Sequence, residues 1–356
     1  MDTTVTDFEQ LRRMRADNPK MRERDLARQC GVSEAELVAA FCGQSAKRIS
    51  TDFNVLFPGL EALGEVLALT RNDSAVHEKV GVYDRYVKGR NASLMLGADI
   101  DMRMFPSAWV HGFAVEKDTG SGVKKSLQFF DGHGEAVHKI HAREATDMEA
   151  WDRLVDQLAL EDQTPGLLAE VVPFEQPERP ALTKAPQSEL RQRWEAMTDP
   201  HQFVGILKDL DLHRLNAFHL AGDTYAWTLD QSAVTALLHH AANDGLPIMC
   251  FVFNRGCIQI HSGPVANIVA KGPWINVMDE GFHMHLRTDQ IAEVWGVRKP
   301  VAEGHVTSVE VFDRDGVQIM QFFGVRGEGK KEREDWRELV EKLPRLQPLA
   351  SGEALA

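Results

Sequence analysis

The sequence predicts an α+β protein built by tandem duplication, with an antiparallel β-sheet and flanking helices in each half. Residues 126–140 align with residues 308–322 in constant register, and each segment reads as strand, turn containing Asp and Gly, and strand. An amphipathic helix is predicted after each hairpin, over residues 147–155 and 332–340, with Trp and Leu at matching positions. Such a repeat indicates the number of domains better than the length of 356 residues does.

The first predicted element is a pair of helices over residues 22–38, separated by a turn at Gly31. The same cadence occurs in modules that read DNA. The second helix, however, would begin with the acidic segment 33–36, where contacts with bases and phosphates need cations. A plain helical hairpin is therefore favoured over a DNA-binding module.

The elements between the helices and the hairpins also recur. Segments 71–77 and 255–261 are strand-like, and each runs from an arginine to a histidine. Segments 17–20 and 198–201 each carry a proline and open a helical stretch. The order of elements is therefore shared between the two halves.

A proline-rich connector separates the halves. Prolines at this density favour an extended chain over a packed element, and they are Pro173, Pro177, Pro180 and Pro186. We therefore predict a first repeat over residues 1–165, a linker over 166–188 and a second repeat over 189–356.

The composition restricts the partners and the compartment. The chain has 40 Lys and Arg against 53 Asp and Glu, and this net charge of -13 repels nucleic-acid backbones and anionic membranes. Its first residues carry no secretory pattern, its apolar runs are too short for a membrane span, and its four cysteines follow neither a redox nor a zinc spacing. We expect a cytoplasmic protein with reduced thiols and no nucleic-acid partner.

His201 has the most informative surroundings of the histidines. Thr198 or Asp199 is a suitable N-cap, Pro200 suits the first helical position, and apolar residues recur at helical spacing from Phe203 onward. The positive end of a helix dipole disfavours an imidazolium, and the neutral ring is the form that binds metals. From the residues alone, His201 is either a metal ligand or an ordinary polar residue at a helix start.

Other motifs give weaker signals. His283 and His285 alternate on a predicted strand, which suits either an exposed polar face or a zinc site that lacks a third ligand nearby in the sequence. The sequence contains no nucleotide-binding glycine loop and no hydrolase nucleophile elbow. It therefore points away from the enzyme classes that those motifs serve.

Short motifs along nearly the whole chain carry a family resemblance. They are Asn18–Asp25, Val76–Lys79, Asp101–Phe105, Asp199–Phe203, Gly256–Pro264, Phe282–Arg287 and Gly324–Arg326. Together they resemble the HemS/ChuS/HmuS family, the cytoplasmic haem-binding proteins of bacterial haem uptake, also called hemin-degrading factors.

The resemblance implies a site for haem, iron protoporphyrin IX, and assigns residues to it. In that family the histidine of the Asp-x-His-Gln-Phe motif holds the iron, and His201 occupies this position. An arginine shortly before a phenylalanine closes over the opposite haem face, which matches Arg103 and Phe105. Basic residues and one glutamine of the second half meet the propionates or line the pocket, and by motif position these are Arg214, Lys299, Arg326 and Gln321.

Some assignments have alternatives. His213 and His219, further along the same helical stretch, are the fallback ligands, and His77 is the candidate for a second haem site. Some family members carry a tyrosine where this chain has Met320. If Met320 faces the haem, it forms an apolar wall and removes a hydrogen-bond donor.

The resemblance implies two candidate functions. We favour a carrier that sequesters haem during iron acquisition and delivers it to a degrading enzyme, because the sequence has no reductant-binding motif. The alternative is a haem-degrading enzyme that opens the porphyrin with an external reductant. The expected partners are haem and an acceptor, either a haem oxygenase or a haem-uptake transporter, and catalytic residues are not assigned.

Overall fold

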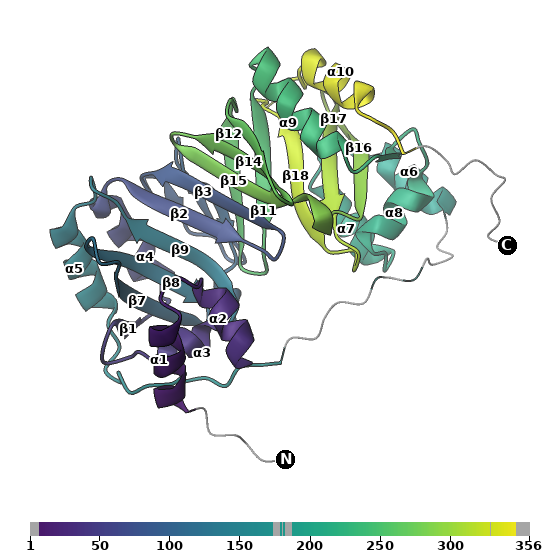
Figure 1. Cartoon of the computed structure of the whole chain (residues 1–356). Coiled ribbons are helices and arrows are strands. Elements are labelled where there is room, and N and C mark those ends of the chain that lie inside the picture. The colour runs from purple at the N-terminus through teal and green to yellow at the C-terminus, as the bar shows by residue number, and fades with distance from the viewer. Residues whose placement is uncertain (1–6, 174–178, 180, 182–186, 328, 347–356) are drawn as a thin grey trace. The chain divides into compact units, whose positions relative to one another are not determined.

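The computed structural model describes residues 7–173, 179, 181, 187–327 and 329–346 (Figure 1). The chain forms two compact units. The first contains Met1–Asn72, Val76–Glu175 and Phe253–Ile260, and the second contains Asp73–Ala75, Gln176–Val252 and His261–Ala356. Each unit thus includes a short segment from the other half of the chain. Of the prolines in the predicted linker, Pro177, Pro180 and Pro186 lie outside the described residues.

The first half of the chain begins with three helices, continues mainly with strands and ends with a helix. Its elements are α1 (Phe8–Asp17), α2 (Glu23–Cys30), α3 (Glu34–Ala39), β1 (Ala46–Ile49), α4 (Phe53–Leu60), η1 (Glu61–Leu63), β2 (Val66–Arg71), β3 (Ala75–Gly81), β4 (Tyr86–Val87), β5 (Ser93–Leu96), β6 (Asp101–Met104), η2 (Pro106–Ala108), β7 (His111–Asp118), β8 (Val123–Phe130), β9 (Ala136–Ala142) and α5 (Met148–Leu158).

An antiparallel sheet in the order β1-β7-β8-β9-β2-β3 forms the centre of the first unit. Helices α4 and α5 cover one face, where Phe57 and Trp151 are fully buried. Helix α3 packs on the other face against Phe113 and Phe130, and α1 and α2 pack against α3. The helix-Gly31-helix prediction is confirmed, because Gly31 ends α2 at φ 72° and Ser33 caps α3.

The second half repeats this order. Its elements are α6 (Gln187–Glu195), α7 (Gln202–Asp209), α8 (Arg214–Ala221), β10 (Ala226–Leu229), α9 (Ala233–Asp244), β11 (Ile248–Phe253), β12 (Cys257–Gly263), β13 (Ile268–Lys271), β14 (Trp274–Asp279), β15 (Phe282–Arg287), η3 (Thr288–Gln290), β16 (Glu293–Val301), β17 (Gly304–Phe312), β18 (Gln318–Gly324) and α10 (Glu334–Lys342).

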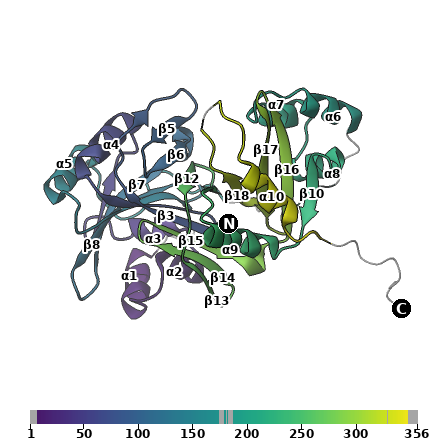
Figure 2. The ribbon, with the colours of Figure 1, turned by 90° about the horizontal axis from the view of Figure 1, so that it is seen from above.

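The sheet of the second unit has the order β10-β16-β17-β18-β11, again antiparallel. Helices α9 and α10 bury one face, and Trp336 of α10 is fully buried there. Helices α6, α7 and α8 pack on the opposite face around Trp194, Phe203 and Phe218 (Figures 1 and 2). Two α+β units with the same arrangement of helices confirm the predicted fold class.

The predicted hairpins are confirmed as β8–β9 and β17–β18, and their turns are alike. The Asp131 carboxylate accepts backbone hydrogen bonds from His133 and Glu135, at 2.9 and 3.0 Å. Gly134 has φ 73°, and Gly316 has φ 79° in the second hairpin. Glycine is favoured at both positions because other residues rarely adopt this left-handed backbone. Within the described residues, no helix is both long and apolar enough to span a bilayer.

Candidate haem site in the second unit

A row of paired residues crosses the sheet of the second unit on the face where α6, α7 and α8 pack. The row consists of Trp295, Glu310, Gln321 and Phe251, on β16, β17, β18 and β11. Paired residues of antiparallel strands project to the same face. Trp295 is buried among the helices, whereas Phe251 is half-buried and packs edge-on against Phe323 with ring centres 5.2 Å apart. The face thus passes from a covered apolar end, through polar side chains, to an aromatic pair.

Glu310 is the centre of a buried ion cluster in this row. Its side chain has no exposed surface, and both of its carboxylate oxygens accept hydrogen bonds from cations. Arg214 donates through Nε at 2.6 Å and Nη2 at 3.2 Å, and Lys299 donates through Nζ at 2.6 Å. These two cations hold the pKa of Glu310 well below its usual range, against the effect of burial.

Lys299 is as deeply buried as its partner. Its side chain is 4% exposed, and Nζ lies 5.0 Å from the ring centre of Phe203. Burial lowers the pKa of Lys299 to about 8, although the neighbouring Glu310 carboxylate acts in the opposite direction. Lys299 therefore lies beneath the surface, and contact with a ligand would require the ion pair to rearrange.

Arg214 is the cation of the cluster that reaches the surface. It begins helix α8, and its side chain is 23% exposed. The guanidinium carbon lies 5.2 Å from the ring centre of Phe203 and 5.9 Å from that of Phe218. Because one edge of the fork is bound to Glu310, the rest of the guanidinium is held in a defined orientation.

His201 lies at the start of α7, but the helix begins later in the sequence than predicted. The helix begins at Gln202 with His201 as its N-cap, rather than at Pro200 after a Thr198 or Asp199 cap. The Asp199 carboxylate instead accepts hydrogen bonds from the backbone N–H of His201, at 2.8 Å, and from its Nδ1, at 2.7 Å. This Asx turn shifts the helix start.

The hydrogen bond to Asp199 sets the chemistry of His201. A carboxylate can only accept, so Nδ1–H donates the hydrogen bond and the lone pair of the neutral ring lies on Nε2. The imidazole is 93% exposed. A ring oriented by a carboxylate through one nitrogen, with the other nitrogen open to solvent, is a common arrangement of metal-binding histidines.

Arg326 lies close enough to this turn to act on it electrostatically. The hydrogen bonds from His201 lower the pKa of Asp199, and the positive charge of Arg326 adds to the effect. Arg326 itself donates to the backbone oxygen of Lys330 at 3.3 Å and lies 3.9 Å from Glu303. The second unit thus has two cationic features on the α7 side, one at Arg326 and one at Arg214.

Met320 does not share the face of Gln321. It pairs with Val311 and Val252, and it is fully buried in the apolar cluster beneath α9 and α10. Successive strand residues point to opposite faces of a sheet. Met320 therefore does not line the face that carries Gln321, where it could form an apolar wall beside a haem.

Arg103 and Phe105 belong to the first unit, and their contacts lie within it. Arg103 lies on β6, where its Nη1 donates to the carboxylate of Asp101 and, at 3.2 Å, to the backbone oxygen of Met102. Phe105 follows β6, is half-buried, and donates its backbone N–H to the oxygen of Gly256 at 3.0 Å. Their predicted role over the distal haem face stays a prediction.

The fallback histidines have other partners. His213 caps α8, because its Nδ1 accepts the backbone N–H of Leu215 at 3.3 Å. His219 lies 3.6 Å from the carboxylate of Glu293, and its ring packs edge-on against Trp295. Both thus have partners of their own, and the choice among the three histidines stays a prediction.

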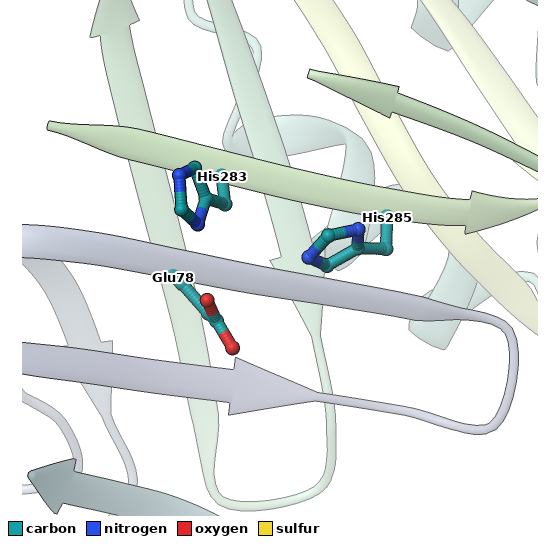
Figure 3. A group of neighbouring side chains, drawn as sticks. All are labelled: Glu78, His283 and His285. Carbon is teal, nitrogen blue, oxygen red and sulfur yellow. The ribbon is translucent and has the colours of Figure 1, made fainter. Parts of the chain in front are cut away.

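His283 and His285 lie on one side of β15, as Figure 3 shows. Their ring centres are 6.3 Å apart. Nδ1 of His285 lies 2.7 Å from Oδ1 of Asn276, whose Nδ2 donates to the backbone oxygen of Val269. Glu78, also labelled in Figure 3, belongs to β3 of the first unit. The pair lies on β15, which pairs with β14 and is not part of the β10-β16-β17-β18-β11 sheet, so we do not assign it to the haem site.

Comparisons with known proteins decide the family. The model of the haemin-degrading HemS/ChuX domain matches residues 31–158 and again residues 211–343. The chain belongs to the HemS family. It is 41% identical to the hemin transport protein HmuS of Yersinia pestis, over 94% of this chain and 96% of that protein.

Solved structures of HemS-family proteins have the same fold. Holo-PhuS, a heme-binding protein from Pseudomonas aeruginosa, is 42% identical, with a TM-score of 0.91 over 95% of this chain and 98% of that one. ChuS, described as an E. coli heme oxygenase, is 37% identical, with a TM-score of 0.83 over 92% of this chain and 98% of that one. The double match of the family model agrees with the predicted duplication.

The two HemS-type repeats differ at the ion cluster. Glu34 begins α3 in the first unit as Arg214 begins α8 in the second, and Lys139 occupies the strand position of Gln321. Lys139 donates to Glu34 at 2.5 Å, and this pair is buried. Lys139 is thus the ion-pair partner of Glu34 in the first repeat, and the charge of Glu34 also acts on Arg24 and Arg71. In the second repeat, two cations surround the single carboxylate of Glu310.

Sequence reasoning missed Glu310 and Asp199 as participants. Glu310 interrupts an apolar strand, Val309-Glu310-Val311, and an isolated charge in such a strand signals a buried partner. From the sequence, Asp199 is identified as a possible helix cap and as part of the family motif, but not as a partner of the His201 ring. Its position two residues before His201 is the signal for an Asx turn that also reaches the ring.

Proposed function

We propose that this chain binds haem through the second unit, with Nε2 of His201 as the iron ligand and Arg214 at a propionate. The observation that carries the proposal is the Arg214–Lys299–Glu310 cluster, in which two cations share one buried carboxylate and one of them, Arg214, reaches the surface. Haem needs a neutral nitrogen ligand, apolar contacts and cations at its carboxylate edge. His201, the aromatic pair Phe251–Phe323 and Arg214 suit these three requirements.

We infer that the physiological role is that of a cytoplasmic haem carrier in iron acquisition. Its relatives in Yersinia pestis and Yersinia enterocolitica are hemin transport proteins, each 41% identical over 94% of this chain. A carrier sequesters haem and passes it to an acceptor, for which a haem oxygenase or a haem-uptake transporter is the candidate. With a net charge of -13, the carrier would favour an acceptor with a basic docking face.

The proposal is tested by titrating the purified chain with hemin and following the Soret band. His201→Ala should shift the band and weaken binding, because the iron loses its nitrogen ligand. Lys20→Ala, at the corresponding turn of the first repeat, is the matched control and should bind like the wild type. If hemin gives no Soret change with the wild-type chain, the haem-binding proposal is wrong. An unchanged spectrum of His201→Ala would move the ligand to His213 or His219.

Haem degradation is the second candidate, because ChuS, at 37% identity, is described as a heme oxygenase. The hemin-loaded chain should be given ascorbate in the presence of catalase and followed spectroscopically. Decay of the Soret band with appearance of a biliverdin-like product would support the enzyme. A Soret band that persists would leave the carrier as the function.

A further inference from the structure

Glu310 accepts more hydrogen bonds than an ion pair alone requires. Besides the three bonds from Arg214 and Lys299, Ser308 Oγ donates to Oε1 at 3.0 Å, and Gln318 Nε2 donates to Oε2 at 2.8 Å. Five donors thus converge on one carboxylate without exposed surface. A carboxylate offers about four lone-pair positions, so Glu310 is saturated and held in place.

The two cations around Glu310 are placed differently. The side chain of Lys299 is only 4% exposed, and its ammonium is paired with Glu310 and lies near the ring of Phe203. Arg214 uses Nε and Nη2 for Glu310 and retains 23% exposure. A guanidinium has five N–H donors, and the Nη1 group is not among the donors to Glu310. Arg214 can therefore serve Glu310 and a second carboxylate at once.

The net charge of the Arg214–Lys299–Glu310 cluster would be balanced by one further anion. Two positive charges and one negative charge leave one positive charge on the cluster. Lys299 offsets the charge of Glu310, and the remaining charge belongs to the cation near the surface. Without Lys299, Glu310 would neutralise Arg214 and weaken its attraction for a ligand carboxylate.

We propose that Glu310 is a positioning residue that turns the outer edge of Arg214 toward one carboxylate of the ligand, and that Lys299 acts through Glu310 without touching the ligand. The inference rests on the proposed haem binding and adds to it the residue that gives the site its preference for a carboxylate. If Glu310 had only a structural role, its substitution would lower the stability and change the affinities for all ligands in the same proportion. A positioning Glu310 affects only ligands that carry the carboxylate.

The test compares hemin with hemin dimethyl ester, which keeps the porphyrin and iron but lacks both charges. The ratio of the two dissociation constants measures the carboxylate preference. Glu310→Gln should reduce this preference by about tenfold, because Arg214 loses its fixed orientation, while the affinity for the ester stays within about twofold of wild type. Burial lowers the pKa of Lys299 and the Glu310 carboxylate opposes this, so the substitution should lower that pKa further and favour the uncharged amine.

Glu34→Gln is the matched control, since it breaks the buried carboxylate–lysine pair of the first repeat. It should destabilise the fold but leave the preference for hemin over the ester unchanged. If Glu310→Gln does not fold, Glu310→Asp keeps the charge, shortens its reach and should lower the preference less. In an Arg214→Gln background, Glu310→Asp should then have no further effect on the preference.

The outcomes separate this inference from the proposed function. Failure of the wild type to bind either porphyrin removes both. Binding of hemin with a preference that Glu310 variants leave unchanged, or a loss of affinity for hemin and ester in equal proportion, overturns the positioning role alone. An additive effect of the Glu310 and Arg214 variants would show that Glu310 acts independently of Arg214 and would also overturn it.

Discussion

His201 combines exposure with orientation through its hydrogen bond to Asp199. The ring is 93% exposed, yet its Nδ1 and its backbone N–H are bound to the same carboxylate oxygen. The ring therefore loses less freedom when Nε2 binds iron than a free surface histidine would. The hydrogen bond to the carboxylate also fixes the tautomer of the ring, with the lone pair of the neutral form on Nε2, as metal binding requires. At the scale of one residue, Asp199 thus determines how the exposed ring of His201 is oriented.

Asp199→Asn should weaken hemin binding about tenfold, since loss of the carboxylate behind a metal-binding histidine typically costs 10- to 100-fold in affinity. The iron–histidine stretching frequency of the reduced complex, measured by resonance Raman spectroscopy, should fall as the ring loses its hydrogen bond to a carboxylate. Asp230→Asn is the control, because Asp230 forms a similar turn with Ser232 at the start of α9. Equal affinity and frequency in the Asp199 variant would contradict the role of this carboxylate.

Motif reasoning located the candidate residues but not their partners. His201 and Arg214 are identified by short motifs, since each motif is local in the sequence. Glu310 is 96 residues from Arg214, and its burial depends on sheet pairing that a single sequence does not reveal. Lys299 illustrates the consequence, because motif position suggests an open cation whereas the structure buries it.

At the scale of elements, the face to which a strand residue points decides its role. Gln321 and Met320 are neighbours in the sequence, yet Gln321 lies beside Glu310 and Met320 lies in the core under α9 and α10. The alternation of β18 could be predicted, but which face carries the site could not, because both faces are covered by helices. The hairpin turns were predictable, since Asp and Gly determine them locally.

Met320→Tyr should lower the free energy of unfolding by about 1–3 kcal/mol, because a larger side chain with a hydroxyl enters a packed apolar cluster. The Soret band of the hemin complex should keep its position, since residue 320 points away from Gln321. Urea unfolding and hemin titration measure the two effects. A shifted Soret band with unchanged stability would place residue 320 at the haem.

A buried histidine makes the core of the first unit sensitive to acid. His138 on β9 is fully buried, with Nδ1 2.9 Å from the hydroxyl of Thr70 and Nε2 2.6 Å from that of Tyr83. Desolvation lowers the pKa of His138 to about 3 from an ordinary value of 6.5. The folded state therefore keeps the ring neutral at pH values where the unfolded chain protonates it.

Stability should fall as the pH drops from 6.5 toward 3, because the unfolded state binds the extra proton in this window. The contribution of His138 is about 1.4 kcal/mol per pH unit there, and it vanishes above pH 6.5. His138→Gln should reduce the slope of the unfolding free energy against pH. Urea unfolding between about pH 4.5 and 6.5, inside that window, measures this slope. His240→Gln, at an exposed histidine, should leave the slope unchanged. An identical slope in both variants would contradict the buried neutral ring.

At the scale of the whole molecule, the duplication is visible in the sequence, but the exchange of segments is not. Aligned hairpins, helices and turns point to two similar units, and the family model matches twice. The segment Phe253–Ile260 nevertheless belongs to the first unit although it lies in the second half of the chain. Sequence alignment of the halves carries no information about which unit a strand joins, because that depends on long-range pairing.

Within the first unit, this segment has a substantial structural role. Its residues Cys257–Ile260 pair with β6, Cys257 is fully buried in the core, and the backbone oxygen of Gly256 accepts the indole N–H of Trp109 at 2.9 Å. A fragment of residues 1–175 lacks all of these contacts. Its first unit is therefore incomplete even though the whole predicted first repeat is present.

Fusing residues 253–260 to the fragment 1–175 through a flexible linker should raise its unfolding free energy by about 2–4 kcal/mol, from the restored hydrogen bonds and buried surface. Urea unfolding followed by tryptophan fluorescence measures the difference, because Trp109 reports on the restored contact. The same fusion with a scrambled 253–260 sequence is the control and should behave like the fragment alone. If the native and scrambled fusions unfold at the same urea concentration, the segment does not contribute to the first unit as the structure indicates, and the simpler picture of two continuous repeats would account for the chain.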